Sequence, residues 1–497
     1  MSRGAARAGG GAPAVSRALS RTPVLGLAAL LLALPACGEE FAQEGHGGQG
    51  GGAPLPPTEP FSLSTGSTGD QWANAVAVDH EGNIIVTGQF EYEIDLGGGP
   101  MQSAGETYPD IFIAKLDPNG EHLWSRRFGG TSTDRGTAVA VDAEGNILLG
   151  ASFAGTVEFD GEALTADSSH ILIAKFDPEG DHLWHRTFGE SEEETGSSYP
   201  SGMALDSEGN IVVIGTFSGS LLLDTEQVAT SDSHQDAFVA KLDPDGAPLW
   251  STAFGGDVND TAFDVAIGPN DEIAVTGDFS GLATIVGYPW TAPTSGSMPY
   301  PNAYVIHLTA DGEPLWGKNL GDTSYQYGYG IDVGPDGTTY ATGGFYGSIN
   351  FDGVERTSHG SYDVYLAAYD NEGGIGWAWQ AGDDSGDNGR QVKLAPDGKL
   401  MLAGTYTVSI DLGTTVLHAE DSSDLFLAQL DTEAHPLWSR SYGGMSTETL
   451  RDMAVDRAGN TILVGYFEGT LEFDDGPLSA VEEADLFIAK IAPPTTE

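Results

Sequence analysis

The side chains best suited to ligand binding gather in two neighbouring segments of the chain. Residues 280–301 hold Tyr288, Trp290 and Tyr300 among prolines and glycines, and a following segment holds Tyr325 and Tyr327. Aromatic rings with amide and carboxyl groups nearby suit stacking on sugar rings or gripping a peptide. We therefore expect these five residues to form a binding surface. The alternative is that they only pack the two segments together.

A second candidate site is a set of acidic or amide residues that returns once in each repeat of the chain. Its members are Gln71, Asp134, Glu194, Asp260, Gln326, Asp387 and Glu448. We expect them to ring the mouth of a channel, where the five carboxylates could hold a cation or a basic peptide. Paired carboxylates could also serve as acid and base in glycoside hydrolysis. The alternative is that they cap free N–H groups of the loops.

Patterns that would mark a particular reaction, metal or cofactor are not found. The chain has no His-Glu-x-x-His, no Gly-x-Ser-x-Gly elbow and no phosphate-binding loop. The acids of the tight turns, such as Asp117 and Asp243, lack the alternating spacing of a calcium loop. His182 and His185, three residues apart on an expected strand, should point to opposite faces. The sequence therefore predicts no metal, no cofactor and no catalytic residue.

A repeat positions these candidates, and its most visible mark is a tryptophan that returns every 60–66 residues. The positions are Trp124, Trp184, Trp250, Trp316, Trp377 and Trp438. Each copy reads as four short strands, which in the first copy lie at 76–79, 84–90, 111–115 and around 123–128, joined by turns rich in Asp, Pro, Asn and Gly. Seven copies of a four-stranded antiparallel unit predict an all-β fold, a seven-bladed β-propeller.

The two ends of the repeat region are predicted to close the ring. Residues 61–65 stand in the register of a fourth strand, and residues 485–491 form a third strand that has no fourth. Together they complete one blade and remove exposed strand edges. The propeller should then span 61–492, with a tail at 493–497. The uniform turns should lie on one face, and the longer loops with the candidate binding residues on the other.

The first 60 residues read as a targeting segment and a tether. A basic stretch precedes an apolar run from Val24 to Ala36, which is too short for a permanent membrane span. The run ends at Cys37, the only cysteine, in the sequence Leu-Pro-Ala-Cys-Gly. This resembles the lipobox of bacterial lipoproteins, which implies removal of residues 1–36 and a lipid anchor on Cys37. An ordinary signal peptide with an incidental cysteine is the alternative. Residues 37–60, rich in Gly and Pro, suit a flexible linker.

The chain is strongly acidic, with 73 acidic and 20 basic residues and a formal net charge of −53. Such a surface repels phosphate backbones and anionic lipid headgroups, which argues against nucleic acid as a partner. It suits cations or basic partners, or it serves solubility alone. We expect a monomer that reaches the membrane only through its lipid.

The recurring runs Gly-Asn-Ile, Phe-Ile-Ala-Lys-Leu-Asp-Pro-Asn-Gly and Leu-Trp…Phe-Gly-Gly resemble the bacterial β-propeller repeat family of the SBBP type, often found in lipoproteins. The resemblance covers residues 61–492 and is weaker where Gly268, Gly334 and Ala395 replace the turn aspartate. It implies a propeller and, with the lipobox, a place at the outer membrane or cell surface of a Gram-negative bacterium. It implies no catalytic residue, because a fold does not by itself set a function.

Three functions stay open on these observations. The first is a lipid-anchored, extracytoplasmic module that binds a glycan or a protein on its loop-rich face. The second is a hydrolase or lyase that acts on extracellular polysaccharide through the acidic ring. The third is a structural assembly module without a small ligand. The absence of catalytic motifs favours the first.

Overall fold

The computed structural model describes residues 59–494 except 106, 160, 190–195, 224–225, 231–233, 296–297, 322–323 and 421. All of them belong to one compact unit, Glu44–Glu497. Cys37, the expected leader and nearly all of the expected linker lie outside the described residues. Every regular element in the described part is a β-strand. It holds no helix that is long and apolar enough to cross a membrane.

A unit of four strands returns along the chain, and we number its members first to fourth in chain order. The first strands are β2 (Gln71–Val78), β8 (Arg135–Val141), β12 (Ser197–Leu205), β18 (Thr261–Ile267), β26 (Gln326–Val333), β32 (Asp387–Leu394) and β38 (Glu448–Val455). The second strands are β3 (Ile84–Phe90), β9 (Ile147–Phe159), β13 (Ile211–Ser218), β19 (Ile273–Phe279), β27 (Thr339–Phe345), β33 (Leu400–Tyr406) and β39 (Thr461–Phe467). The third strands are β6 (Asp110–Leu116), β10 (Glu162–Phe176), β16 (Asp236–Leu242), β24 (Asn302–Leu308), β30 (Asp363–Tyr369), β36 (Asp424–Leu430) and β42 (Asp485–Ile491). The fourth strands are β7 (His122–Gly130), β11 (His182–Phe188), β17 (Pro248–Gly256), β25 (Pro314–Asn319), β31 (Ile375–Ala381), β37 (Pro436–Tyr442) and β1 (Phe61–Thr65).

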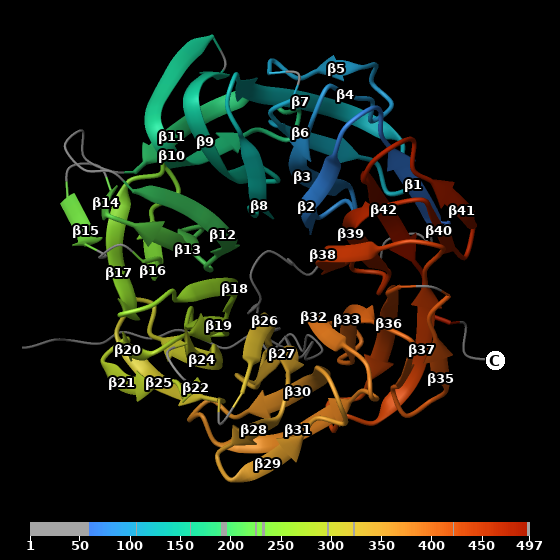
Figure 1. Ribbon diagram of the computed structural model, residues 1–497. Coiled ribbons are helices and arrows are strands. Elements are labelled where there is room, and N and C mark those ends of the chain that lie inside the picture. The colour runs from blue at the N-terminus through green and yellow to red at the C-terminus, as the bar shows by residue number, and fades with distance from the viewer. Residues whose placement is uncertain are drawn as a thin grey trace, which may run out of the picture. The chain divides into compact units, whose positions relative to one another are not determined.

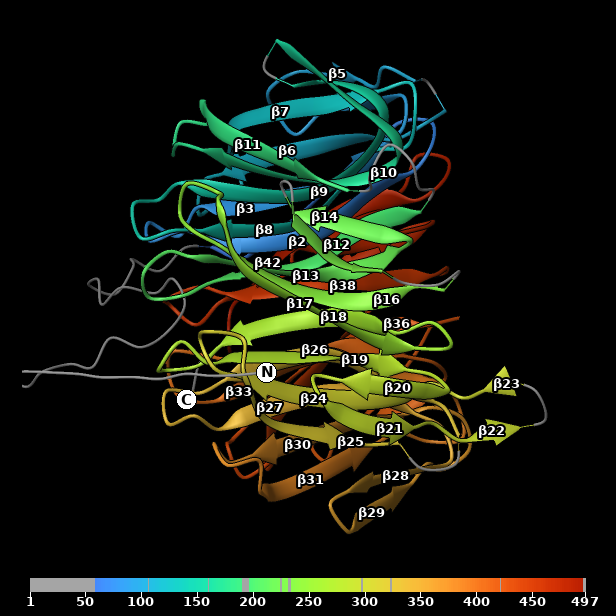
Figure 2. The same ribbon diagram turned by 90° about the vertical axis from the view of Figure 1, so that its left-hand side faces the viewer.

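The four strands of a unit pair antiparallel, first to second to third to fourth. The first strands contact one another in chain order, and β38 contacts β2, so that they surround a central channel. Figure 1 shows the units around this channel, with the fourth strands toward the outside. Figure 2 shows the units from the side, with β22 (Thr294–Ser295) and β23 (Met298–Pro299) reaching beyond the other strands on one face of the ring. The fold is all-β and propeller-like.

The last unit is built from both ends of the described chain. β1 pairs antiparallel with β42, from Phe61↔Lys490 to Thr65↔Leu486, and β42 pairs with β39 on its other edge. Trp124 opposes Lys115 in the first unit in the way that Phe61 opposes Lys490. The pairing of the two ends, and the register of Phe61, are therefore as the sequence predicts.

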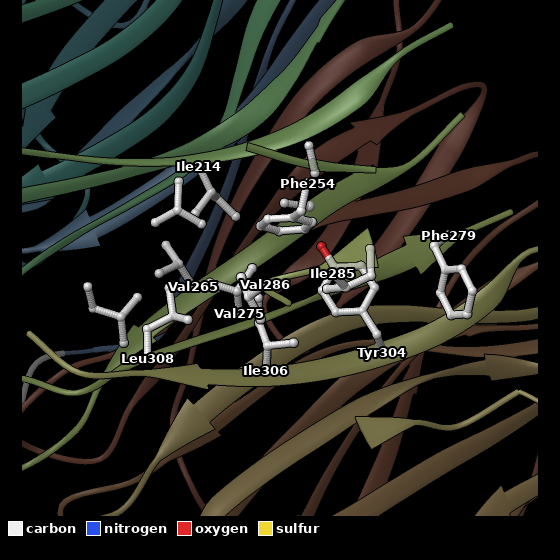
Figure 3. Packing of buried hydrophobic residues seen from close by; sticks show 14 of the residues in the cluster. Ile214, Phe254, Val265, Val275, Phe279, Ile285, Val286, Tyr304, Ile306 and Leu308 are labelled. Atoms are coloured by element: carbon white, nitrogen blue, oxygen red, sulfur yellow. The ribbon is translucent and has the colours of Figure 1, made fainter. Parts of the chain in front are cut away.

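The second and third strands carry most of the core. All seven residues of β3, β6, β19 and β24 are buried, because each sheet is covered on both sides by its neighbours. In the cluster shown in Figure 3, Tyr304 and Val275 pack with Ile214 of the preceding unit. The Phe254 and Tyr304 rings meet edge to face, with their centroids 5.9 Å apart.

A buried ion pair joins the third strand to the turn after the first strand in four units. The pairs are Lys115–Asp79 at 2.9 Å, Lys175–Asp142 at 2.9 Å, Lys241–Asp206 at 2.7 Å and Lys490–Asp456 at 3.1 Å. Asp79 also accepts backbone hydrogen bonds from Glu81 and Asn83 in its own turn. Each of these lysines donates in addition to a carbonyl oxygen in a turn of the next unit, as Lys115 does to Pro178. One lysine thus stabilises both a turn and a junction between sheets.

The units in which Gly268, Gly334 and Ala395 replace this aspartate have also lost the lysine. Their third strands carry His307, Ala368 and Gln429 at the lysine position. His307 stacks on the Trp316 ring at 4.3 Å and shares a hydrogen bond of 2.8 Å with Thr339. Burial lowers the pKa of His307 to about 4, so the imidazole is neutral. The joint replacement avoids a buried charge without a partner.

The repeated tryptophan packs on a turn of the next unit. Gly180 lies against the Trp124 indole so closely that a Cβ there would come within 2.7 Å of the ring. The Nε1 of Trp124 donates to the carbonyl oxygen of Pro178 at 3.1 Å. Phe61 takes the corresponding place against Gly120. These rings therefore hold neighbouring sheets together.

The connections between second and third strands differ from the sequence expectation of irregular loops. Most of them form a further two-stranded hairpin at the outer rim, and in the second unit the ends of β9 and β10 pair with each other. The hairpins are β4 (Glu93–Ile94) with β5 (Met101–Gln102), β14 (Ser220–Leu223) with β15 (Glu226–Thr230), β20 (Leu282–Ile285) with β21 (Tyr288–Thr291), β28 (Ser348–Phe351) with β29 (Val354–Thr357), β34 (Ser409–Asp411) with β35 (Val416–His418), and β40 (Thr470–Phe473) with β41 (Gly476–Ser479). An apolar residue of the hairpin fills the junction to the preceding unit, as Phe159 does by stacking on Phe128 at 4.2 Å. Alternation such as Thr-Leu-Glu-Phe at 470–473 was the sequence signal for these strands.

Candidate functional site

The predicted acidic ring does not line the channel mouth. Its described members are buried, with at most 1% of their surface exposed: Gln71, Asp134, Asp260, Gln326, Asp387 and Glu448. They stand at the starts of the first strands, opposite an aromatic residue of the second strand, as Gln71 stands opposite Phe90. This burial corrects the expectation of an open ring of carboxylates.

For Gln71, Asp134, Asp260 and Asp387 the alternative of backbone capping is correct, because each accepts a hydrogen bond from a loop N–H group. The two carboxylate oxygens of Asp134 accept hydrogen bonds from the N–H groups of Gly130 at 2.9 Å and Ala154 at 3.0 Å. Each such side chain thereby ties the loop before the first strand to the end of the second strand. Burial raises the pKa of Asp134 to about 7 and that of Asp260 to about 8.

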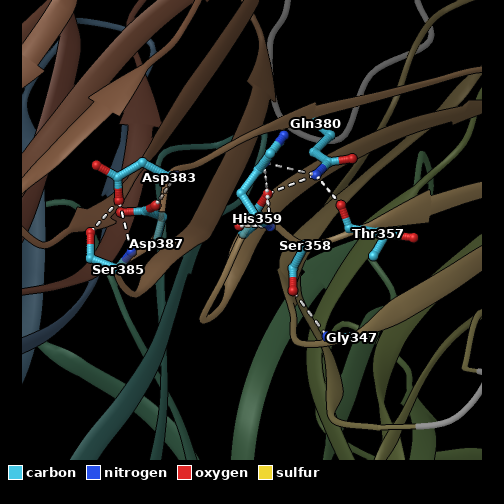
Figure 4. A network of polar contacts seen from close by, with 9 residues as sticks. Gly347, Thr357, Ser358, His359, Gln380, Asp383, Ser385 and Asp387 are labelled. Atoms are coloured by element: carbon cyan, nitrogen blue, oxygen red, sulfur yellow. Dashed lines mark hydrogen bonds and ion pairs between the residues drawn. The ribbon is translucent and has the colours of Figure 1, made fainter.

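Asp387 repeats this arrangement. Its Oδ2 accepts from the N–H of Asp383 at 3.0 Å, and its Oδ1 accepts from the N–H of Thr407 at 3.3 Å. Figure 4 shows Asp387 beside Asp383 and Ser385 in this loop. Burial raises the pKa of Asp387 to about 7. The buried carboxyls thus hold loops, which removes them from the surface on which a polysaccharide would lie.

The third unit has a serine where the sequence reading placed Glu194. Ser198 opposes Phe217 in the register that Gln71 takes opposite Phe90, and it is 1% exposed. Glu194 itself lies outside the described residues. Ser198 stands eight residues before Asp206, as Gln71 stands eight before Asp79. That constant spacing was the signal that identifies the position.

His182 and His185 do not point to opposite faces. Nδ1 of His185 lies 3.2 Å from Nε2 of His182, and their rings stack at 5.2 Å. The pairing of β10 with β11 shifts by one residue between Lys175 and Phe176, which oppose Trp184 and His182. Such a bulge cancels the alternation of a regular strand and brings the two rings to one side.

The five aromatic residues predicted to form one surface lie in two separate clusters. Tyr288 and Trp290 belong to β21 at the rim, where their rings stack at 5.9 Å. They cover Gly317 of β25, where a Cβ would lie 3.1 Å from the Tyr288 ring, and Trp290 lies 5.6 Å from Phe279. This pair is the apolar underside of a hairpin, so for it the packing alternative is correct.

Tyr300, Tyr325 and Tyr327 do come together, and two further tyrosines join them. The ring centroids of Tyr300 and Tyr325 are 4.6 Å apart, and Tyr362 lies 6.5 Å from Tyr325 and 6.1 Å from Tyr327. Tyr346 lies 6.0 Å from Tyr362 and is 42% exposed. We call these five residues the tyrosine surface. Tyr300, Tyr325 and Tyr362 end loops opposite the tight turns, Tyr327 stands at the start of β26 and Tyr346 follows β27, so the surface spreads over the fourth and fifth units.

The hydroxyls of Tyr327 and Tyr362 are protonated at neutral pH and can donate hydrogen bonds. Burial and neighbouring tyrosines raise the pKa of both Tyr327 and Tyr362 above the ordinary value. Aromatic faces with protonated hydroxyls at their edges present both apolar and polar contacts to a ligand.

The surface continues into the central channel, a cavity of about 990 Å³. Every first strand has a one-residue bulge in its pairing with the second strand, and the bulged residue lines the channel. The seven bulged residues are Asn74, Thr137, Ser201, Phe263, Tyr329, Arg390 and Arg451, and we call them the bulge ring. Bulges often aim a side chain in this way at functional sites.

The bulge ring is chemically asymmetric. Its amide and hydroxyl members lie in the first three units, its aromatic members in the next two and its arginines in the last two. Tyr329 connects the aromatic part of the ring to the arginines and to the tyrosine surface. Its ring stacks on Tyr327 at 5.6 Å and lies 5.4 Å from Phe263. The guanidinium of Arg390 lies 4.3 Å from the centroid of the Tyr329 ring. Burial raises the pKa of Tyr329 to about 12.

A second arginine of the ring is held by two stacked aromatic rings. Trp72 and Tyr466 stack at 4.8 Å, and the Arg451 guanidinium lies 5.4 Å and 5.2 Å from their centroids. Arg135, on β8 of the second unit, lines the same cavity. Burial, together with the nearby charges of Arg390 and Arg135, lowers the pKa of Arg451.

Further along the channel, the charged side chains pair with one another and with backbone N–H groups of neighbouring strands. Lys393 lies 3.5 Å from an oxygen of Asp264, and Asp264, Asp332 and Asp452 accept backbone hydrogen bonds from the neighbouring first strand, as Asp264 does from Ile331 at 3.0 Å. Burial raises the pKa of Asp452 to about 6 and that of Asp332 in the same direction. The nearby carboxylates raise the pKa of Lys393 in spite of its burial. These groups stitch adjacent sheets together.

Sequence reasoning missed Tyr346, Tyr362 and the whole bulge ring. The ring has a sequence signal, since its members stand five residues before the turn position, as Asn74 does before Asp79 and Arg451 before Asp456. This spacing was hard to recognise as a site because the residue type at the position changes along the chain, from Asn74 to Arg451. Among the residues that the structure describes, no group of three His, Cys, Asp or Glu side chains is placed to hold a metal ion.

Comparison with known proteins indicates a WD40- or β-propeller-like repeat protein. The chain is 20% identical over 486 residues to an uncharacterized WD repeat-containing protein, L264, of Acanthamoeba polyphaga mimivirus, which covers 79% of this chain and 35% of the relative. It is 25% identical over 296 residues to the regulatory protein FlaEY of Caulobacter vibrioides, over 58% of this chain and 29% of the relative. The chain thus spans about a third of the length of the curated relatives it matches.

Among solved structures, the WD40 domain of Neurospora crassa Pan2 is similar with a TM-score of 0.43 and 10% identity, over 86% of this chain and 90% of that domain. No protein-family model matches the sequence.

Proposed function

We propose that this chain is a seven-bladed β-propeller that serves as a lipid-anchored, extracytoplasmic binding module and takes a glycan on its tyrosine surface. Proteins with propeller-like repeats generally act as interaction scaffolds. The observation that carries the proposal is the unbroken contact among the five tyrosines, with successive centroids 4.6–6.5 Å apart. Such a cluster of rings, gathered around Tyr362, offers aromatic surfaces against which sugar rings can pack.

Two arguments support a binding role over catalysis on this face. The carboxyls that could have served a hydrolase, such as Asp134 and Asp387, are buried and engaged with backbone N–H groups. The tyrosine surface itself brings aromatic rings and hydroxyls together. Aromatic rings and hydroxyls are the groups that sugar binding requires.

The anchor and the location are part of the same proposal. Cys37 would carry the lipid, and residues 38–60 would let the folded part stand away from the outer membrane or cell surface of a Gram-negative bacterium. A propeller that binds glycans at such a place would have access to polysaccharide outside the cell.

Binding of the full-length protein to a panel of neutral polysaccharides tests the proposal, with wild type compared to Tyr325→Ala and Tyr362→Ala. Tyr108→Ala is the matched control, because Tyr108 is 51% exposed and precedes a third strand as Tyr300 does, but in the first unit. We expect affinity about tenfold lower or worse in the two variants and unchanged in the control. Equal binding by all four proteins, or binding only to a protein partner, contradicts the glycan proposal.

A further inference from the structure

We infer that the bulge ring and Arg135 form a binding site for the carboxylate of a single acidic sugar at the mouth of the channel. The site adjoins the tyrosine surface, where Tyr329 stacks on Tyr327, but its occupation does not require that surface to bind a glycan. The argument rests on three observations about charge, wall chemistry and space.

The first observation is that the arginines are placed without carboxylate partners. In the part of the chain that the structure describes, no ion pair is formed by Arg135, Arg390 or Arg451, and the Nε atoms of Arg135 and Arg390 are buried without a hydrogen-bond partner. This is unusual in a chain with 73 acidic and 20 basic residues, where a carboxylate is easily found. Guanidinium groups are the preferred partners of a carboxylate because their N–H donors match its two oxygens.

The second observation is that the rest of the ring suits a sugar better than a bare inorganic anion. Phe263, 36% exposed, and Tyr329 offer aromatic faces on one side. Asn74, Thr137 and Ser201 line the other side, where each donates one hydrogen bond to a backbone carbonyl oxygen and its side-chain oxygen can accept from a sugar hydroxyl. A pyranose acid has an apolar ring face, hydroxyls at its edge and one carboxylate, so each arc of the ring has a counterpart on the ligand.

The third observation concerns the size of the cavity and the negative charge of the chain around it. The cavity of about 990 Å³ is large enough for a monosaccharide unit. The chain as a whole is strongly acidic, with a formal net charge of −53, so a polymer with many carboxylates is repelled by the surface before it reaches the arginines. The favoured ligand is therefore neutral except for one acidic unit.

Guanidinium groups do not lose their charge near neutral pH, so the site should work across that range. The affinity should fall as salt is added, since the ion pairs are open to the solvent of the channel. Contact of the Arg451 guanidinium with both rings of the stacked Trp72–Tyr466 pair holds it in place before the ligand arrives, which lowers the entropic cost of binding.

Calorimetric titration of the full-length protein with sodium glucuronate tests the inference, with glucose and inorganic phosphate as comparison ligands. Arg390→Gln and Arg451→Gln remove one charge each, and Arg186→Gln is the matched control. Arg186 also lies over a tryptophan, 5.5 Å from the Trp184 centroid, but on the fourth strand β11. Thermal unfolding of each variant confirms that it is folded.

We expect glucuronate to bind to wild type and Arg186→Gln alike, and about tenfold or more weakly to each of the other two variants. Glucose should bind far more weakly than glucuronate, and Tyr325→Ala should leave glucuronate binding intact. Tyr325→Ala therefore tests the two proposals independently, because it should weaken binding on the tyrosine surface without changing glucuronate binding.

Several results would overturn the inference. They are no glucuronate binding to wild type, equal binding to Arg390→Gln and Arg451→Gln, or binding of phosphate as tight as that of glucuronate. Tighter binding of a short neutral peptide with a free C-terminal carboxylate than of glucuronate would reassign the site to a peptide.

Discussion

At the scale of single residues, the most informative feature is a pair of positions that change together along the chain. Asp79, Asp142, Asp206 and Asp456 each meet a buried lysine, and the units without the aspartate have no lysine either. A buried ion pair adds little stability by itself, whereas a lone buried charge costs several kcal/mol. The same molecule therefore contains units with the Asp–Lys pair and units with neither residue.

This comparison predicts the stability of variants in the first unit. Lys115→Gln leaves the Asp79 carboxylate buried without its cation and should lower the free energy of unfolding by about 3 kcal/mol. The double variant Asp79→Ala, Lys115→Gln copies the Ala395 and Gln429 pair of the sixth unit and should recover part of this loss. Denaturant unfolding of the two variants and wild type gives the measurement. A double variant less stable than Lys115→Gln would contradict the argument.

A further residue-scale prediction concerns the lysine of the channel. Lys393→Met leaves Asp264, Asp332 and Asp452 around an uncharged side chain. We expect a loss of about 2 kcal/mol at pH 8. The loss should shrink at pH 5, because the Asp452 carboxyl, with its pKa raised to about 6, is then largely protonated. A loss that is the same at both pH values would show that the carboxylates do not depend on the lysine.

At the scale of elements, the decisive contact is the one between the two ends of the described chain. β1 fills the fourth-strand position beside β42, and Ser62 is further held by Asp475 in the last hairpin, with its N–H 2.7 Å from the carboxylate. Without β1, the edge of β42 would be open to pairing with other chains.

Deletion of residues 61–65 should therefore lower the melting temperature and cause self-association. The control is deletion of the same number of residues from the segment before 59, which lies outside the described residues. Thermal unfolding and size-exclusion chromatography with light scattering measure the two effects. A deletion variant as stable and as monomeric as the control would show that the ring does not need this strand.

The hairpins at the rim show why the prediction of a binding surface on the connections between second and third strands was wrong for Tyr288 and Trp290. The sequence reading assigned the connections between second and third strands to a binding surface because they vary in length and hold aromatic residues. The structure uses Tyr288 and Trp290 as the underside of one hairpin against β25. An aromatic residue in a connection has the same sequence signature whether it faces a ligand or the next sheet.

At the scale of the whole molecule, buried carboxyls should make stability depend on pH in an unusual direction. Burial raises the pKa of Asp134, Asp278 and Asp387 to about 7 and that of Asp260 to about 8, against an ordinary value of about 4 for the unfolded chain. Between these values the folded state holds more protons than the unfolded state. The free energy of unfolding therefore falls as the pH rises from about 4 to 8.

We expect the midpoint of urea unfolding to be higher at pH 5 than at pH 8, and the excess of negative charge acts in the same direction. Asp278→Asn replaces one of these carboxyls by a neutral group of the same size and should flatten the pH dependence. A midpoint that rises with pH, or an unchanged slope in Asp278→Asn, would contradict the assignment.

The sequence by itself determined the repeat, the four strands of each unit and the pairing of 61–65 with 485–491. These follow from local signals, namely turn residues at fixed spacing and short apolar runs, whose physical cause lies within a few residues. It also identified Tyr300, Tyr325 and Tyr327 as neighbours, because the connection before a third strand and the connection before the next first strand emerge on the same face.

Only the tertiary structure decided which side chains face the channel. A single bulge in each first strand turns Asn74 or Arg390 into the cavity, while Gln71 and Asp387, three residues earlier, point into the junctions between sheets and are buried. Whether a polar residue caps a loop or meets a ligand depends on that one-residue shift and on the sheets packed around it. Because packing across the ring involves residues far apart in the chain, no local pattern of residue types records it.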